Sequence, residues 1–120
     1  MTYRKVGKSN TPYPSWIRNL DGKSGAYVIK EGSRVVYVGE SHTGRLRKTL
    51  TRHFQVWERT FNPFDISGWS KHTGHVYSRA SCSVAVYITT RSGAVAKQNA
   101  LIKRLKPRDN QIGAVDEVPF

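Results

Sequence analysis

The chain has 120 residues, which is enough for one domain with one hydrophobic core and too few for two. Twenty Lys and Arg against eight Asp and Glu give a formal net charge of +12, so the expected partner is a polyanion. The apolar and aromatic content is close to a globular average, which excludes a disordered or fibrous chain, and no apolar run approaches the roughly 20 residues of a membrane-spanning helix.

One cysteine, Cys82, excludes an internal disulfide framework and is typical of a reducing compartment. Residues 1–14 lack the apolar stretch that a secretory signal needs. Together these features predict an intracellular, cytoplasmic protein that has no membrane partner.

Residues 1–24 are predicted to form a basic N-terminal arm with little regular structure. They are rich in Ser, Asn, Pro and Gly, and Trp16 and Ile17 are the candidate anchors to a core. The cations of this arm are Lys5, Lys8, Arg18 and Lys23.

Two short segments with β-branched and aromatic residues follow, at 25–30 and 34–38, and predict two strands. The link between them is Glu31, Gly32 and Ser33, a short polar connection containing glycine. Such a link predicts a β-hairpin.

The hydrophobic period changes to three and four residues in the stretch 44–56, where Leu46, Leu50 and His53 share a face. This stretch predicts an amphipathic, basic helix. Residues 58–81 then show no sustained periodicity, and they are interpreted as an insertion loop that is either functional or mobile.

Residues 82–90 alternate strictly, with Val84, Val86 and Ile88 on one face, and predict a third strand. Ser92 is the expected N-cap of a second helix at about 93–105, and residues 111–120 are expected to form a tail. The order strand, strand, helix, strand, helix predicts a single α/β domain over 25–110, with a small three-stranded sheet, a hairpin plus a third strand, flanked by helices.

Two tripeptides in the predicted hairpin carry a family resemblance. Gly25-Ala26-Tyr27 lies in the first strand and Tyr37-Val38-Gly39 in the second, ten residues later. This pair resembles the motifs that name the GIY-YIG nucleases, with Ala26 and Val38 in place of the isoleucines. Further matches lie where that family has them, and they are Arg45, Arg47, His53, Leu101, Ile102, Leu105, Pro107 and Asn110.

The resemblance implies an endonuclease that hydrolyses phosphodiester bonds with Mg²⁺ or Mn²⁺. Tyr27 would orient or deprotonate the attacking water, with Tyr37 beside it. Arg45 and Arg47 are alternative phosphate ligands, and only one of the two can face the cleft. His53 is a candidate general base or phosphate ligand, with a buried structural histidine as the alternative.

The family's metal-binding glutamate precedes the Leu-Ile pair by three residues, and in this chain that position is Gln98. Ala94, Gln98, Leu101 and Leu105 are spaced by four, three and four residues, so Gln98 is expected on the inward helix face. An amide keeps some hydrogen bonds of a carboxylate and loses its charge, so Mg²⁺ is expected to bind weakly or not at all. The chain is therefore expected to be inactive or impaired, whether Gln98 is natural or engineered.

Double-stranded DNA is the expected partner, and a separate DNA-reading domain has no room in so short a chain. Specificity would then come from the 58–81 loop, from the arm or from the partner of a homodimer. The alternative is a non-catalytic nucleic-acid-binding module with the same fold, and a basic RNA-binding structural protein would explain the charge alone. The cations expected on DNA are Lys48, Arg52, Lys71, Lys103 and Arg104.

Overall fold

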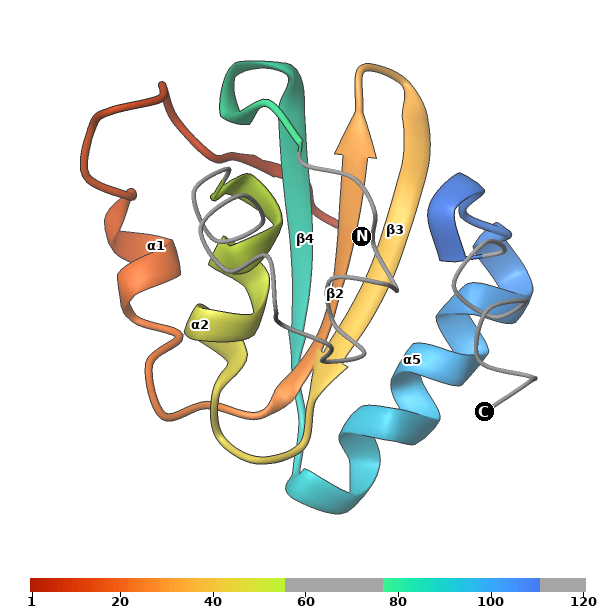
Figure 1. Ribbon diagram of the computed structural model, residues 1–120. Coiled ribbons are helices and arrows are strands. Elements are labelled where there is room, and N and C mark those ends of the chain that lie inside the picture. The colour runs from red at the N-terminus through yellow and green to blue at the C-terminus, as the bar shows by residue number, and fades with distance from the viewer. Residues whose placement is uncertain (56–76, 111–120) are drawn as a thin grey trace, which may run out of the picture.

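A four-stranded antiparallel sheet forms the centre of the molecule, in the strand order β1-β4-β2-β3 (Figure 1). The structure, a computed structural model, describes residues 1–55 and 77–110. The strands are β1 (Arg4–Lys5), β2 (Gly25–Glu31), β3 (Arg34–Ser41) and β4 (Cys82–Ile88).

The prediction of three strands is wrong by one, because β1 adds a fourth strand at the free edge of β4. Its two residues pair in register as Arg4 with Val84 and Lys5 with Ser83. A two-residue strand made of two cations has neither alternation nor β-branched side chains, so its pairing is set by the tertiary contact and not by local pattern.

The predicted hairpin of β2 and β3 is confirmed, and both strands extend slightly beyond the predicted limits. Gly32 in the link has a φ of 60°, a conformation that glycine adopts without steric cost. A register shift after Ile29 pairs Ile29 with Tyr37 and Lys30 with Val35. The extra residue between these pairs is Val36, and this bulge lets Val36 and Tyr37 pack on the same side of the sheet.

The described helices are short apart from the last one. They are α1 (Ser15–Arg18), α2 (Leu46–Thr51), the 3-10 turns η1 (Arg52–Phe54) and η2 (Arg79–Ser81), and α5 (Arg91–Leu105). The predicted helix at 44–56 is thus a shorter α-helix that tightens into a 3-10 turn. Within the described ranges, none of these helices is long and apolar enough to cross a membrane.

The helix predicted at about 93–105 is confirmed, but its N-cap is Thr90 and not Ser92. Thr90 Oγ1 accepts a hydrogen bond from the backbone N–H of Gly93 at 3.1 Å. Lys106 closes the helix in the left-handed region, with a φ of 49°. Thr90 is the better cap because its extended backbone directs the hydroxyl at the orphan N–H groups of the first turn.

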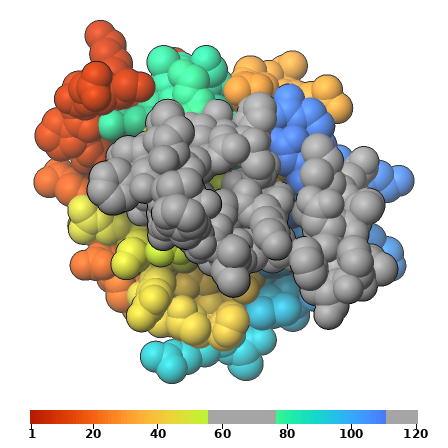
Figure 2. All heavy atoms as spheres, in the orientation of Figure 1, coloured from red at the N-terminus to blue at the C-terminus, as the bar shows by residue number. Residues whose placement is uncertain are grey.

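Two hydrophobic clusters lie on the two faces of the sheet. The strict alternation of β4 is confirmed, since Val84 and Val86 pack in one cluster while Ala85 and Tyr87 pack in the other. The first cluster contains residues of α1 and α2, and the second contains Leu101 of α5. In the space-filling view, α1 and the C-terminal end of α5 lie on opposite sides of the molecule (Figure 2).

The N-terminal arm contributes to the core, and its two candidate anchors, Trp16 and Ile17, are part of this packing. Val6 and Ile17 are completely buried, and Leu20 is 7% exposed. The buried guanidinium of Arg79 donates to the carbonyl oxygens of Val6 at 3.0 Å and Thr11 at 2.8 Å, so it fixes the arm to the segment before β4. Isolated apolar residues in a polar stretch show no period, so the sequence indicated Ile17 as an anchor but not Val6 or Leu20.

Replacing Ile17 with alanine tests the structural role of the arm. Because Ile17 is completely buried, Ile17→Ala should lower the free energy of unfolding by about 2–5 kcal/mol, as measured by urea denaturation. The matched control is Ile88→Ala, at a side chain that is 56% exposed, which should change it by no more than about 0.5 kcal/mol. Equal effects of the two changes would show that the arm is not part of the core.

Candidate active site

Tyr27 and His53 form a buried hydrogen-bonded pair at the centre of the candidate site. Tyr27 comes from the central strand β2 and His53 from η1, 26 residues later, and the phenol oxygen lies 2.7 Å from Nε2 of the imidazole. Both residues are about 1% exposed. The pair therefore ties the segment after α2 to the middle of the sheet.

Gly39 makes the space that the Tyr27 phenol occupies. Gly39 is the register partner of Tyr27 on β3, and a Cβ atom at Gly39 would overlap the ring and hydroxyl of Tyr27. Any side chain at this position would displace the phenol from His53. Steric contact with Tyr27 therefore explains why the second tripeptide ends with a glycine in this chain.

Tyr37 completes the group on the same face of the sheet. Its ring centroid lies 4.5 Å from that of His53 and 6.3 Å from that of Tyr27. Tyr37 directly follows the bulged residue Val36 on β3. Three of the residues predicted for the site are therefore in mutual contact.

Burial keeps the pair electrically neutral. Burial first, and the charge of Arg52 second, lower the pKa of His53 from 6.5 to about 3. Burial, then Tyr37 and Glu40, raise the pKa of Tyr27 well above 10, against an opposing effect of Arg52. At neutral pH a phenol and a neutral imidazole share the hydrogen bond, and the imidazole tautomer decides which of the two donates.

Arg52 is the arginine whose charge acts on the pair. It precedes His53 directly in η1 and is half-buried. The two predicted phosphate ligands lie elsewhere, since Arg45 is exposed at the N-cap of α2 and Arg47 lies 4.0 Å from Asp21. Arg52 was predicted as a DNA contact and not as a residue of this site.

Tyr77 and Asp109 belong to the same buried region and were not predicted for the site. The ring centroids of Tyr77 and His53 are 6.1 Å apart, and the backbone N–H of Tyr77 donates to the carbonyl of His53 at 2.9 Å. The Tyr77 hydroxyl donates to Asp109, which also accepts from Arg108 at 2.8 Å. Tyr77 lies at the end of the predicted loop, where no periodicity gave a signal.

Asn110 holds the outer edge of β3. Its amide oxygen accepts from the backbone N–H of Val38 at 2.6 Å, and its amide nitrogen donates to the carbonyl of Val38 at 2.8 Å. Both open backbone groups of Val38 are thereby satisfied by one side chain. Asn110 thus fixes the strand segment that carries Tyr37 and Gly39.

Gln98 is half-buried on α5 between the buried residues Ala94 and Leu101, as its helical spacing predicted. That helix packs on the face of Ala26, Val28 and Val38, whereas Tyr27, the partner of His53, lies in the cluster of the other face. Among the described residues, the side chain of Gln98 has no hydrogen bond.

The residues present do not fit a tightly held Mg²⁺ or Mn²⁺ ion. Hard dications need carboxylate oxygens, and the expected position offers the neutral amide of Gln98. The acid that acts electrostatically on Tyr27 is Glu40, which pairs with His42 at 3.1 Å. In the part of the chain that the structure describes, no three His, Cys, Asp or Glu side chains are arranged to hold a metal.

The cations predicted on DNA are divided between the two sides of the sheet. Lys48 is exposed on α2, and Lys103 and Arg104 are exposed in the last turn of α5. Lys71 lies outside the described residues.

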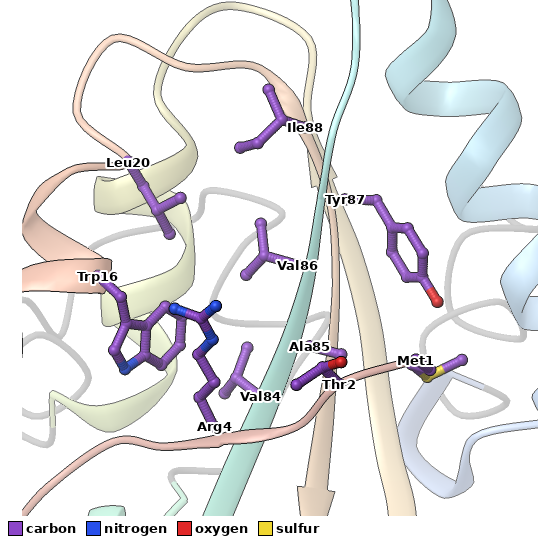
Figure 3. A pocket seen from close by; sticks show the side chains of 10 residues that line it. All are labelled: Met1, Thr2, Arg4, Trp16, Leu20, Val84, Ala85, Val86, Tyr87 and Ile88. Atoms are coloured by element: carbon purple, nitrogen blue, oxygen red, sulfur yellow. The ribbon is translucent and has the colours of Figure 1, made fainter.

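A cavity of about 380 Å³ lies beside the edge of β4, between this strand, α1 and the start of the chain (Figure 3). Its lining is largely apolar and includes Trp16, Leu20 and Val86, with the side chain of Arg4 beside them. None of Tyr27, Tyr37 and His53 lines it, so this cavity is separate from the candidate active site.

No protein-family model matches this chain, and no curated protein matches it. The resemblance to GIY-YIG nucleases therefore rests on the motif residues and on the contacts that three of them make.

The low pKa of His53 predicts an acid-sensitive fold. The unfolded state binds a proton near pH 6.5 and the folded state only near pH 3, so the free energy of unfolding falls as the pH is lowered through this window. The contribution should approach 1.4 kcal/mol per pH unit, roughly, between pH 6 and 4, as measured by urea denaturation. His53→Gln should remove this pH dependence of the free energy of unfolding, whereas His42→Gln, at an exposed histidine, should leave it unchanged. An unchanged slope in His53→Gln would contradict the assignment.

Proposed function

We propose that this chain is a phosphodiester hydrolase of the GIY-YIG type that acts on DNA, and that Gln98 leaves it impaired or inactive. The observation that carries the proposal is the contact of Tyr27, Tyr37 and His53. These residues were selected from short motifs, and their side chains pack together although they come from β2, β3 and η1. If the two tripeptides matched the motifs by chance, we would not expect one of their tyrosines to form a buried hydrogen bond with the predicted histidine.

The chemistry available from the chain itself is orientation by hydrogen bonding. The neutral imidazole of His53 can accept a hydrogen bond from the Tyr27 hydroxyl across 2.7 Å, which would orient the phenol oxygen toward an attacking water. Arg52 supplies a fixed positive charge near both groups, and such a charge stabilises the negative charge that develops on a phosphate. The dication would supply Lewis-acid activation in an active version of the site.

A second candidate, a non-catalytic nucleic-acid-binding module, is supported by a different observation. Tyr27 and His53 are about 1% exposed, and their contact would stabilise the fold whether or not a phosphate ever reaches it. With a neutral amide at position 98, the fold and its cations would suffice for binding. Metal-dependent cleavage separates the two candidates.

Gln98→Glu is the central test of the nuclease proposal. The change restores the carboxylate of the family position on the half-buried face of α5, and it should create or raise Mg²⁺-dependent nicking of supercoiled plasmid DNA. A metal-binding charge can contribute several kcal/mol in the transition state, and each 1.4 kcal/mol is about a tenfold change in rate, so the increase should span orders of magnitude.

Two matched variants control this test. Gln98→Ala should show no nicking, and Tyr27→Phe added to Gln98→Glu should abolish the gain, because it removes one hydroxyl and keeps the ring beside His53. If the Gln98→Glu protein binds DNA but does not nick it with Mg²⁺ or Mn²⁺, the binding-module candidate replaces the nuclease.

Binding to duplex DNA should weaken steeply with salt. With a net charge of +12, contacts to phosphates should dominate, and each one contributes a slope of about −0.9 in a plot of log affinity against log salt concentration. Titration of a labelled duplex between low and physiological salt by fluorescence anisotropy measures the slope. A flat dependence would contradict a polyanion as the partner.

A further inference from the structure

Helix α5 is basic along its whole length. Its fifteen residues, Arg91–Leu105, include Arg91, Lys97, Lys103 and Arg104 and not a single acid. Cations in the last turn favour the helix dipole, but a cation in the first turn opposes it, so helix stability does not explain the charge of Arg91. An acid-free helix on the surface is suited to a polyanion.

Two tyrosines from other elements pack on the α5 side of the sheet. Tyr87 is on β4 and Tyr3 is in the segment before β1, and both are half-buried against the cluster that contains Leu101. Figure 3 shows the Tyr87 ring on the side of β4 opposite to Val84, Val86 and Ile88. The two rings therefore border the basic helix.

Each of these rings carries a lysine ammonium group. Lys97 Nζ lies 4.4 Å from the ring centroid of Tyr87, and Lys30 Nζ lies 4.8 Å from that of Tyr3. Arg104, in the last turn of α5, acts electrostatically on Tyr3. We name these five residues the α5 patch, and they are Tyr3, Lys30, Tyr87, Lys97 and Arg104.

The cations of the patch have no ion pair within the described residues. The acids there pair with other cations: Asp21 lies near Arg47, Glu31 near Arg108, Glu40 near His42 and Asp109 near Arg108. A cation over an aromatic ring gains only about 0.5–1 kcal/mol at an exposed site, so this contact does not hold the ammonium group firmly in place. Among the described residues, no acid neutralises the charge of the patch.

We propose that the α5 patch binds single-stranded nucleic acid. The lysine stems are flexible, so an ammonium group can leave the ring for a phosphate while a base stacks on the ring face that it uncovers. One ring and one cation would hold one nucleotide, and the patch has two such pairs with Arg104 beside them. Unpaired bases expose their faces, whereas a duplex hides them, so the combination of rings and cations favours a single strand.

The patch and the Tyr27–His53 pair lie on opposite faces of the sheet, since Tyr87 and Tyr3 belong to the cluster of α5 and Tyr27 to the cluster of α2. The inference therefore does not rest on the proposed nuclease function. The two proposals also name different ligands: the α5 patch would bind unpaired nucleotides, whereas the nuclease would act on duplex DNA.

The test measures binding of fluorescein-labelled dT12, rU12 and a 12-base-pair duplex by anisotropy. The double variant Lys97→Gln/Arg104→Gln removes two charges from the patch, and it should lower the affinity for dT12 about tenfold or more. The matched control Arg18→Gln/Lys23→Gln removes two charges from exposed positions near α1, and it should lower this affinity less than about threefold. Tyr87→Leu keeps apolar packing and removes the ring, and it should lower the affinity for dT12 about tenfold with little effect on the duplex.

The outcomes divide cleanly. Equal losses in the patch variant and the control would show that net charge alone binds the strand, and would overturn the proposal. Duplex binding that is as tight as dT12 binding, and equally reduced by Tyr87→Leu, would overturn the assignment to single strands. Comparable affinities for dT12 and rU12 would assign both DNA and RNA as ligands. Binding of only one of these two oligonucleotides would assign that nucleic acid alone. If Tyr87→Leu fails to unfold cooperatively, the charge variants still decide whether the α5 patch binds the strand. Plasmid nicking by Gln98→Glu is a separate assay, so failure of the nuclease proposal can be distinguished from failure of this one.

Discussion

The hydrogen bond between Tyr27 and His53 is the contact on which the rest of the site depends. A phenol and an imidazole can share a dry interior only if each satisfies the other, because an unpaired buried polar group costs about 1–3 kcal/mol. The contact needs the space at Gly39, the hydrogen bonds by which Asn110 holds Val38 of β3, and the backbone hydrogen bond from Tyr77 to His53. Residues that are far apart in the sequence thus converge on one buried pair.

The fold was predictable wherever the signal was local. The hairpin, the alternating strand β4 and helix α5 each carry a period, a turn residue or a cap within a few positions, and each was found with small errors at the ends. Strand β1 and the burial of Val6 have no such signal. They follow from contacts with β4 and Arg79, which are remote in sequence, so composition made residues 1–24 look like an arm with little regular structure.

The site was predictable only in part, for a related reason. Tyr27, Tyr37 and His53 could be selected because motifs mark them, whereas Tyr77 lies in a stretch without periodicity and Asp109 is selected only by its contact with Tyr77. The choice between Arg45 and Arg47 stayed open in the sequence, and neither is the cation that acts on the pair. That cation is Arg52, which was predicted only as a DNA contact.

The charge of the chain and the neutrality of the pair are linked through Arg52. Arg52 and burial both lower the pKa of His53, and burial is the larger cause. A phosphate that neutralised Arg52 would remove only the smaller cause, and it would leave the imidazole dry and without a proton. His53 therefore stays a hydrogen-bond acceptor for Tyr27, or a donor from its neutral tautomer, with or without a polyanion bound. In this chain the histidine can orient a hydroxyl by accepting its hydrogen bond, but it does not hold the spare proton that a general acid would have to give to a leaving group.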